Sequence, residues 1–139
     1  MIYLDSSAVV KLVRWETHTE DLVAWLEERR NSALVSSCLV EIEVPRAIRR
    51  YDPSALPSVS PTIRRLYRVE INAEVRERAA SYEDPQLRSL DAIHLATAEM
   101  LAGQLNELEA VVAYDERLLT AAAARGLTAL GPGFWNERT

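Results

Sequence analysis

Short apolar runs alternate along the chain with segments of helical periodicity, and this alternation limits the fold more than any other feature. The short runs cover residues 2–4, 33–35, 66–71, 110–114 and 127–130. The helical segments cover residues 8–13, 19–30, 38–50, 73–82, 89–103 and 116–125. Strands that alternate with helices form a parallel sheet covered on both faces. We therefore predict a three-layer α/β/α sandwich with a mostly parallel sheet of four to five short strands.

The length of 139 residues fits one hydrophobic core, and the composition, with 48% hydrophobic and 27% charged residues, is that of a globular protein. The proline-rich stretch 52–62 is too short to separate domains. We expect a single domain over residues 1–139.

The chain carries one cysteine, Cys38, so it has no intramolecular disulfide framework and no cysteine-rich zinc site. Asp5 interrupts an N-terminus that lacks a basic region, which argues against a signal peptide. No apolar run approaches the roughly 18 residues that a membrane helix needs. These features predict a cytoplasmic protein with no membrane partner.

The formal net charge of −5 argues against a protein that holds nucleic acid through a general positive field. Lys11 is the only lysine, and many of the arginines come in groups, at 29–30, 46–50 and 64–68. Arginine favours bidentate contacts with carboxylate or phosphate. Solvated helix faces are the alternative explanation for each group.

Four acidic residues fall where a ligand site is expected, beyond the carboxyl ends of the strands. Asp5 and Asp115 directly follow the first and fourth predicted strands. Glu43 lies about two turns into the helix after the second strand, and Asp91 lies in the first turn of the most apolar helix. The topology therefore predicts the place of Asp5 and Asp115 more directly than that of the other two.

Each acid also has a structural explanation. Asp5 is a suitable helix N-cap, and Asp91 would stabilise a helix N-terminus by about 0.3–1 kcal/mol. Glu43 stands three residues before Arg46, with which an ion pair would contribute about 0.2–0.5 kcal/mol, and Asp115 suits a turn. These explanations do not say why acids rather than serine or asparagine collect at one edge.

Electrostatics limits what a cluster of four acids can be. Two carboxylates about 4 Å apart repel by about 4 kcal/mol at an effective dielectric near 20. Such a cluster needs protonation, arginine partners or a divalent cation. Hard oxygen ligands without cysteine or paired histidines favour Mg²⁺ or Mn²⁺.

The segments that carry these acids resemble the PIN-domain ribonucleases, and in particular the VapC toxins of bacterial toxin–antitoxin pairs. The matching stretches are Ile2–Ala8, Ser37–Ala47, Leu90–Ala96 and Tyr114–Leu118, with a continuation through Ala123–Leu127 to Pro132. Each stretch alone is weak evidence, whereas all of them in family order, with the string Asp-Ala-Ile-His-Leu-Ala, are specific.

The resemblance implies that Asp5, Glu43, Asp91 and Asp115 form the family's acidic quartet, with Asp5 and Asp91 as the most direct metal ligands. It further implies a Mg²⁺- or Mn²⁺-dependent endoribonuclease toxin that cuts transfer or ribosomal RNA. A VapB-like antitoxin would block the site, and the toxin would form a homodimer. Ser7 matches a small hydroxyl residue that supports the first acid.

Further residues extend this hypothesis. We expect Ser7, Arg46 and Arg50 to contact RNA or the antitoxin, with local salt bridges as the alternative for the arginines. His94 lies one turn after Asp91 in an apolar helix, where a buried histidine with its hydrogen bonds satisfied is expected rather than a metal ligand.

Three residues bear on whether the site is intact. Glu41 competes with Glu43 for its role, although both cannot point into one site because they lie about 200° apart on a helix. Pro45 is expected to kink that helix unless it falls in the first turn. Ala113 stands where many family members have threonine or serine, so support for Asp115 is in question.

Two other classes of function are open. A catalytically impaired PIN-like module that binds RNA or protein would keep the fold without the reaction. An unrelated acidic-pocket protein is disfavoured, because a phosphotransfer receiver needs a lysine after a late strand and a haloacid-dehalogenase-type phosphatase needs Asp-x-Asp, where this chain has Ser7.

Overall fold

The sheet has six strands in the spatial order β3-β2-β1-β4-β5-β6. The computed structural model describes residues 1–105 and 107–138. The first five strands are parallel and the sixth is antiparallel to β5. The strands are β1 Ile2–Leu4, β2 Leu34–Ser37, β3 Tyr67–Val69, β4 Ala110–Val112, β5 Ala129–Gly131 and β6 Trp135–Arg138.

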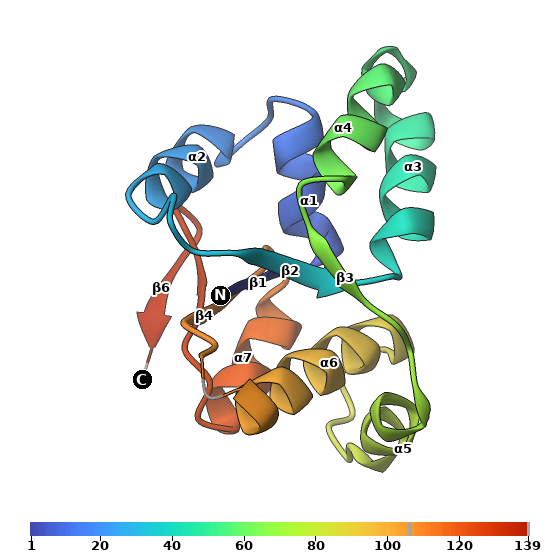
Figure 1. Cartoon of the computed structure of the whole chain (residues 1–139), viewed down its shortest axis with the longest axis vertical. Coiled ribbons are helices and arrows are strands. Elements are labelled where there is room, and N and C mark those ends of the chain that lie inside the picture. The colour runs from blue at the N-terminus through green and yellow to red at the C-terminus, as the bar shows by residue number, and fades with distance from the viewer. Residues whose placement is uncertain (106, 139) are drawn as a thin grey trace.

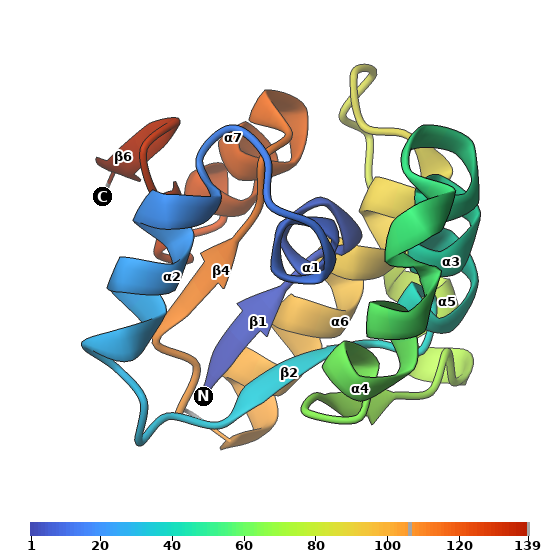
Figure 2. The same ribbon diagram turned by 90° about the horizontal axis from the view of Figure 1, so that it is seen from above.

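Helices cover both faces of this sheet (Figure 1). One face carries α1 Ser6–Val13, α2 Thr19–Glu27, α3 Val40–Tyr51, the 3₁₀ helix η1 Pro53–Ser58 and α4 Val59–Ile63. The other face carries α5 Ala73–Ser81, α6 Ser89–Leu105 and α7 Glu116–Ala124. Viewed from above, α1 lies between α2 on one side and α3 and α4 on the other (Figure 2). The predicted three-layer α/β/α sandwich is confirmed.

The alternation of side chains along β1 places residues in both halves of the core. Ile2 and Leu4 pack with the helices of the first face, whereas Tyr3 packs with Ala98 and Leu101 of α6 on the other. All three residues of β1 are completely buried, because β1 lies between β2 and β4 in the middle of the sheet. This alternation puts the Tyr3 side chain on the same side of the sheet as α6.

Two details differ from the sequence-based expectations, and a third leaves one untested. Strand β6 was not expected, and it forms because the turn before it, with Gly133 at φ +83° and a hydrogen bond from Phe134 N to Gly131 O, reverses the chain. Helix α2 ends at Glu27, before Arg30. Pro45 lies in the sixth position of α3, which extends to Tyr51, so it is past the first turn and the kink expected there stays a prediction.

The chain order of the strands creates a switch point beside β1. From β1 the chain proceeds to β2 and β3 on one side, and it then returns to β4 and β5 on the other. Ligands of open parallel sheets bind at such points, beyond the carboxyl ends of the strands. In the described part of the chain, no helix is long and apolar enough to cross a membrane.

Candidate active site

Asp5 follows β1 directly and begins the site. Its backbone is extended and its Oδ1 caps α1, accepting hydrogen bonds from Ala8 N at 3.0 Å and from Ser7 Oγ at 2.6 Å. The residue is only 4% exposed, and burial raises the pKa of the carboxyl to about 6 in spite of these hydrogen bonds. The expected N-cap role is confirmed, but no donor reaches Oδ2 among the described residues.

Ser7 joins the first acid to the segment that carries the last one. Its hydroxyl donates to Asp5 and accepts a hydrogen bond from the backbone N–H of Tyr114, at 2.9 Å. Tyr114 immediately precedes Asp115, so the start of α1 is tied to the end of β4. This inward position fits the expected support of the first acid. Contact of Ser7 with RNA or an antitoxin stays a prediction.

Glu43 points into the same region from the first turns of α3. Its Oε1 accepts hydrogen bonds from Ser6 Oγ at 2.7 Å and from His94 Nε2 at 2.8 Å. Burial alone would raise the pKa of this carboxyl, but its hydrogen bonds with His94 and Ser6 hold the pKa below its usual value. The suggested local pair with Arg46 is wrong, because Glu43 pairs with His94 instead.

Glu41 points away from this region. Its carboxylate lies 3.5 Å from Arg68 of β3, and the residue is exposed. The side chains of Glu41 and Glu43 thus separate as the helical geometry requires, and Glu43 is the one that belongs to the candidate site.

His94 is the buried, hydrogen-bonded histidine that the apolar helix predicts. The residue is 2% exposed, and both ring nitrogens have partners. Glu43 is the close partner at Nε2, where the Ser6 hydroxyl also lies at 3.2 Å, and the Tyr3 hydroxyl is the partner at Nδ1, at 2.7 Å. The sequence argument therefore gave its burial correctly and missed its link to an acidic residue.

Asp91 lies in the first turn of α6 and is half-buried. Burial and the neighbouring charge of Asp115 raise its pKa. Its hydrogen bond is a long one, from Arg88 N at 3.4 Å, and no arginine forms an ion pair with it in the described part of the chain. Asp91 is thus a carboxylate without a close cationic partner.

Asp115 follows β4 and caps α7. It accepts hydrogen bonds from Arg117 N at 2.9 Å and Leu118 N at 3.4 Å, and from the Arg117 guanidinium at 3.2 and 3.4 Å. Although burial opposes it, these bonds and the guanidinium charge hold the pKa of this carboxyl low. The guanidinium partner was not expected from the sequence.

The four acids therefore lie at one edge as two neighbouring pairs. Glu43 contributes to the raised pKa of Asp5, and Asp115 to that of Asp91. His94 lies three residues after Asp91 in α6 and is hydrogen-bonded to Glu43. Acids that follow β1, lie in α3 and α6, and cap α7 thus come near one another close to the switch point. The strand topology predicted this place directly only for Asp5 and Asp115.

The donor set fits a hard divalent cation in chemistry. No group of three acidic, histidine or cysteine side chains within the described residues is already arranged around a metal position. However, the buried carboxylate of Asp5 and the half-buried one of Asp91 lack cationic partners, and carboxylate oxygens are the ligands that Mg²⁺ and Mn²⁺ prefer. An added cation would relieve the charge that these groups carry.

Comparisons with known proteins bear on the family of this chain. The model of the PIN domain matches residues 2–124. Ribonuclease VapC35 of Mycobacterium tuberculosis is 49% identical over 133 residues, which are 96% of this chain and 98% of the relative. The chain belongs to the PIN-domain family, among the VapC ribonucleases. Ribonuclease VapC46 of M. tuberculosis is 37% identical over 131 residues, or 94% of this chain and 97% of the relative.

Solved structures share the fold of this VapC-family chain at low identity. M. tuberculosis VapC20, described as a toxin that cleaves the sarcin-ricin loop, gives a TM-score of 0.71 at 15% identity, covering 95% of this chain and 100% of its own. FitAcB from Neisseria gonorrhoeae gives a TM-score of 0.71 at 18% identity, covering 96% of this chain and 99% of its own. These likenesses confirm the PIN-like fold.

Two other features of this PIN domain bear on its function. Arg46 and Arg50 are exposed on α3, where Arg50 stacks over the Tyr51 ring and neither forms an ion pair within the described residues. The expected local salt bridges are therefore not found, whereas contact with RNA or an antitoxin stays a prediction.

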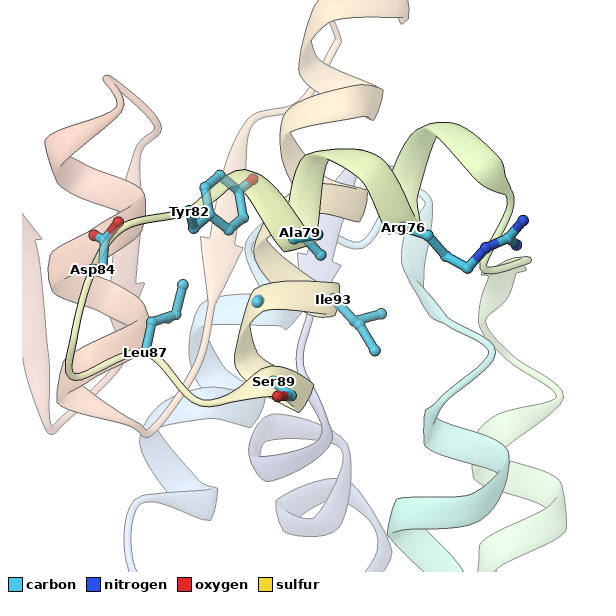
Figure 3. Close-up of a pocket in the computed structure, with 9 residues that line it drawn as sticks. Arg76, Ala79, Tyr82, Asp84, Leu87, Ser89 and Ile93 are labelled. Carbon is cyan, nitrogen blue, oxygen red and sulfur yellow. The ribbon is translucent and has the colours of Figure 1, made fainter.

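The second feature is a cavity of about 410 Å³ beneath α5. Tyr82 and Ala79 line it from one side, and Leu87, Ser89 and Ile93 from the other (Figure 3). None of the four site acids lines this cavity, so it is distinct from the acidic site.

Proposed function

We propose that this chain is a metal-dependent endoribonuclease that hydrolyses RNA phosphodiester bonds as the toxin of a VapBC-type pair. The observation that carries the proposal is the arrangement of the acids in two neighbouring pairs, Asp5 with Glu43 and Asp91 with Asp115, near the switch point of a PIN fold. The close similarity to VapC35 and VapC46, both ribonucleases by name, supports RNA as the substrate.

Asp5 and Asp91 would hold Mg²⁺ or Mn²⁺, and Glu43 and Asp115 would act beside them directly or through water. A bound divalent cation supplies the activation of water and the neutralisation of phosphate charge that such hydrolysis needs. Burial of Asp5 keeps water away from that carboxylate and strengthens its attraction for a cation. The lowered pKa of Glu43 keeps its carboxylate ionised and able to accept a hydrogen bond from water.

The Arg117 guanidinium has a supporting role in this proposal. It balances the charge of Asp115 before RNA arrives and also lies within electrostatic reach of Asp91. Because guanidinium binds phosphate and carboxylate with similar geometry, Arg117 is able to exchange one for the other when a phosphodiester enters.

The partners follow from the same proposal. The cognate partner would be a VapB-like antitoxin that covers the acidic site, and the toxin would form a homodimer in the cytoplasm. The solved structure of VapBC2 from Rickettsia felis, bound to a DNA fragment from their promoter, gives a TM-score of 0.69 at 14% identity. It covers 98% of this chain and 100% of its own. The target would be transfer or ribosomal RNA.

Mapping of cleavage ends tests the function directly. Total RNA is sequenced for new 5′ ends after the wild type or Asp5→Asn is induced, with and without a co-expressed antitoxin. We expect defined new ends in one RNA class with the wild type alone. Equal cleavage by Asp5→Asn would contradict the proposed site. A wild type that cuts no RNA but still binds its antitoxin would instead indicate a catalytically impaired binding module.

A further inference from the structure

A chain of buried polar groups leads from the middle of the sheet to Glu43. The Tyr3 hydroxyl lies 2.7 Å from His94 Nδ1, and His94 Nε2 lies 2.8 Å from Glu43 Oε1. Tyr3 is fully buried and His94 is 2% exposed, so bulk water does not compete for these bonds. The two rings meet edge to face at 5.9 Å. This chain passes from β1 through α6 to α3.

The carboxylate of Glu43 determines which atoms of His94 and Tyr3 donate in these two hydrogen bonds. An ionised carboxylate only accepts hydrogen bonds, so the close contact with Glu43 requires His94 Nε2 to carry a proton. In the neutral imidazole the other nitrogen, Nδ1, is then an acceptor, and it needs a donor inside the core. The Tyr3 hydroxyl is in position to donate to it. Tyr3 thereby selects the tautomer that faces Glu43 with an N–H.

The chain also determines which oxygen of Glu43 is available. Ser6 Oγ and His94 Nε2 both reach Oε1, whereas no hydrogen-bond donor reaches Oε2 in the described part of the chain. Two donors on one oxygen fix the rotation of the carboxylate and leave the second oxygen for another ligand.

We propose that Tyr3 is a positioning residue of the site, which locks His94 in its Nε2–H tautomer so that Glu43 is held by Oε1 and presents Oε2 to a metal ion or its water. The inference rests on the proposed function for its effect on catalysis. The tautomer itself is a property of the metal-free protein and is testable without RNA.

The first experiment is ¹⁵N NMR of the histidine rings in metal-free protein near neutral pH. The chain has two histidines, His18 and His94, so loss of one set of signals in His94→Gln assigns the spectrum. We expect His94 to show a protonated Nε2 and an unprotonated Nδ1 in the wild type. In Tyr3→Phe we expect a mixture of ring states. A wild-type ring protonated on Nδ1, or on both nitrogens, would overturn the proposal.

The second experiment measures the consequence for the site. Loss of a hydrogen-bond partner behind a metal ligand typically costs ~10–100-fold in affinity or activity. We expect Tyr3→Phe to lower kcat for RNA cleavage in this range with little change in KM, and to weaken Mn²⁺ binding measured by calorimetry. Tyr82→Phe is the matched control, since it also removes a phenol hydroxyl from a side-chain hydrogen bond, here one to the Glu99 carboxylate away from the four site acids. Equal losses in both variants would overturn the proposal.

A double-mutant cycle shows whether Tyr3 acts through His94. If it does, Tyr3→Phe lowers kcat in the wild type and adds nothing in the His94→Gln background. An equal effect in both backgrounds would refute the route through the imidazole. If wild type cleaves no RNA and binds no Mn²⁺, the proposed function fails, while the NMR result still decides the tautomer.

Discussion

Asp5→Asn is expected to make the metal-free protein more stable while removing its activity. The Asp5 carboxylate is buried without a cationic partner, and its pKa rises from 3.8 to about 6 on folding. Because the folded state binds the proton more tightly than the unfolded state, ionisation of Asp5 destabilises the fold. Asparagine keeps a carbonyl oxygen for the Ala8 N–H and the Ser7 hydroxyl without carrying the charge.

The magnitude follows from the size of the pKa shift. A shift from 3.8 to about 6 corresponds to about 3 kcal/mol when the carboxyl is fully ionised. The penalty is absent below the unfolded pKa, grows as the pH rises between the two pKa values, and is constant above the folded one. By the same linkage relation it falls to about half near pH 5.

The assay is urea unfolding of wild type and Asp5→Asn in EDTA at several pH values. We expect the variant to be more stable near pH 8 and the difference to shrink as the pH falls toward 5. Asp84→Asn is the control of opposite sign, because Arg125 lowers the pKa of that carboxyl and the substitution removes a favourable pair. A difference in the free energy of unfolding between wild type and Asp5→Asn that does not vary with pH would refute the reasoning.

Three further predictions concern metal, substrate and the support of the first acid. Millimolar Mg²⁺ or Mn²⁺ should raise the wild-type Tm and leave that of Asp5→Asn unchanged, with the free energy of unfolding of the wild type raised by about 2.7 kcal/mol at a concentration 100 times Kd. Equal Tm shifts in both proteins would place the cation elsewhere. Arg46→Ala should weaken RNA binding more at low than at high salt, and more than Arg49→Ala, which removes the same charge further round α3 from the site. A loss of RNA affinity that does not depend on salt would contradict a phosphate contact. Ser7→Ala should lower the free energy of unfolding by about 1–3 kcal/mol, because the Tyr114 N–H loses its acceptor, and Ser7→Thr should restore much of this stability. Chemical denaturation measures both variants, and a Ser7→Ala protein as stable as the wild type would show that the hydroxyl is dispensable.

Much of the fold follows from local pattern in the sequence. The apolar triplet at β1 and the caps at Asp5 and Asp115 define their elements through contacts a few residues apart. Strand β6 lacks such a pattern, because it depends on pairing with β5 across a tight turn. The sequence Gly131-Pro132-Gly133 before it marks that turn and would have indicated a reversal of the chain.

The candidate site is predictable only in part. Parallel topology placed Asp5 and Asp115 at one edge, since Asp5 follows β1 directly and Asp115 comes three residues after the end of β4. The partner of Glu43 was not predictable, because His94, Glu43 and Tyr3 are far apart in sequence and meet only when α6 and α3 pack against the sheet. The proximity of Asp91 to Asp115 likewise depends on how the start of α6 lies beside α7.

A crystal structure of the protein with Mn²⁺ tests the central claim most directly, since anomalous scattering identifies the ion. The account predicts one Mn²⁺ position bounded by the carboxylates of Asp5 and Asp91, with Glu43 and Asp115 beside it, and no such peak in crystals of Asp5→Asn. Manganese bound only elsewhere on the molecule, or wild-type crystals without any bound ion at saturating Mn²⁺, would contradict it.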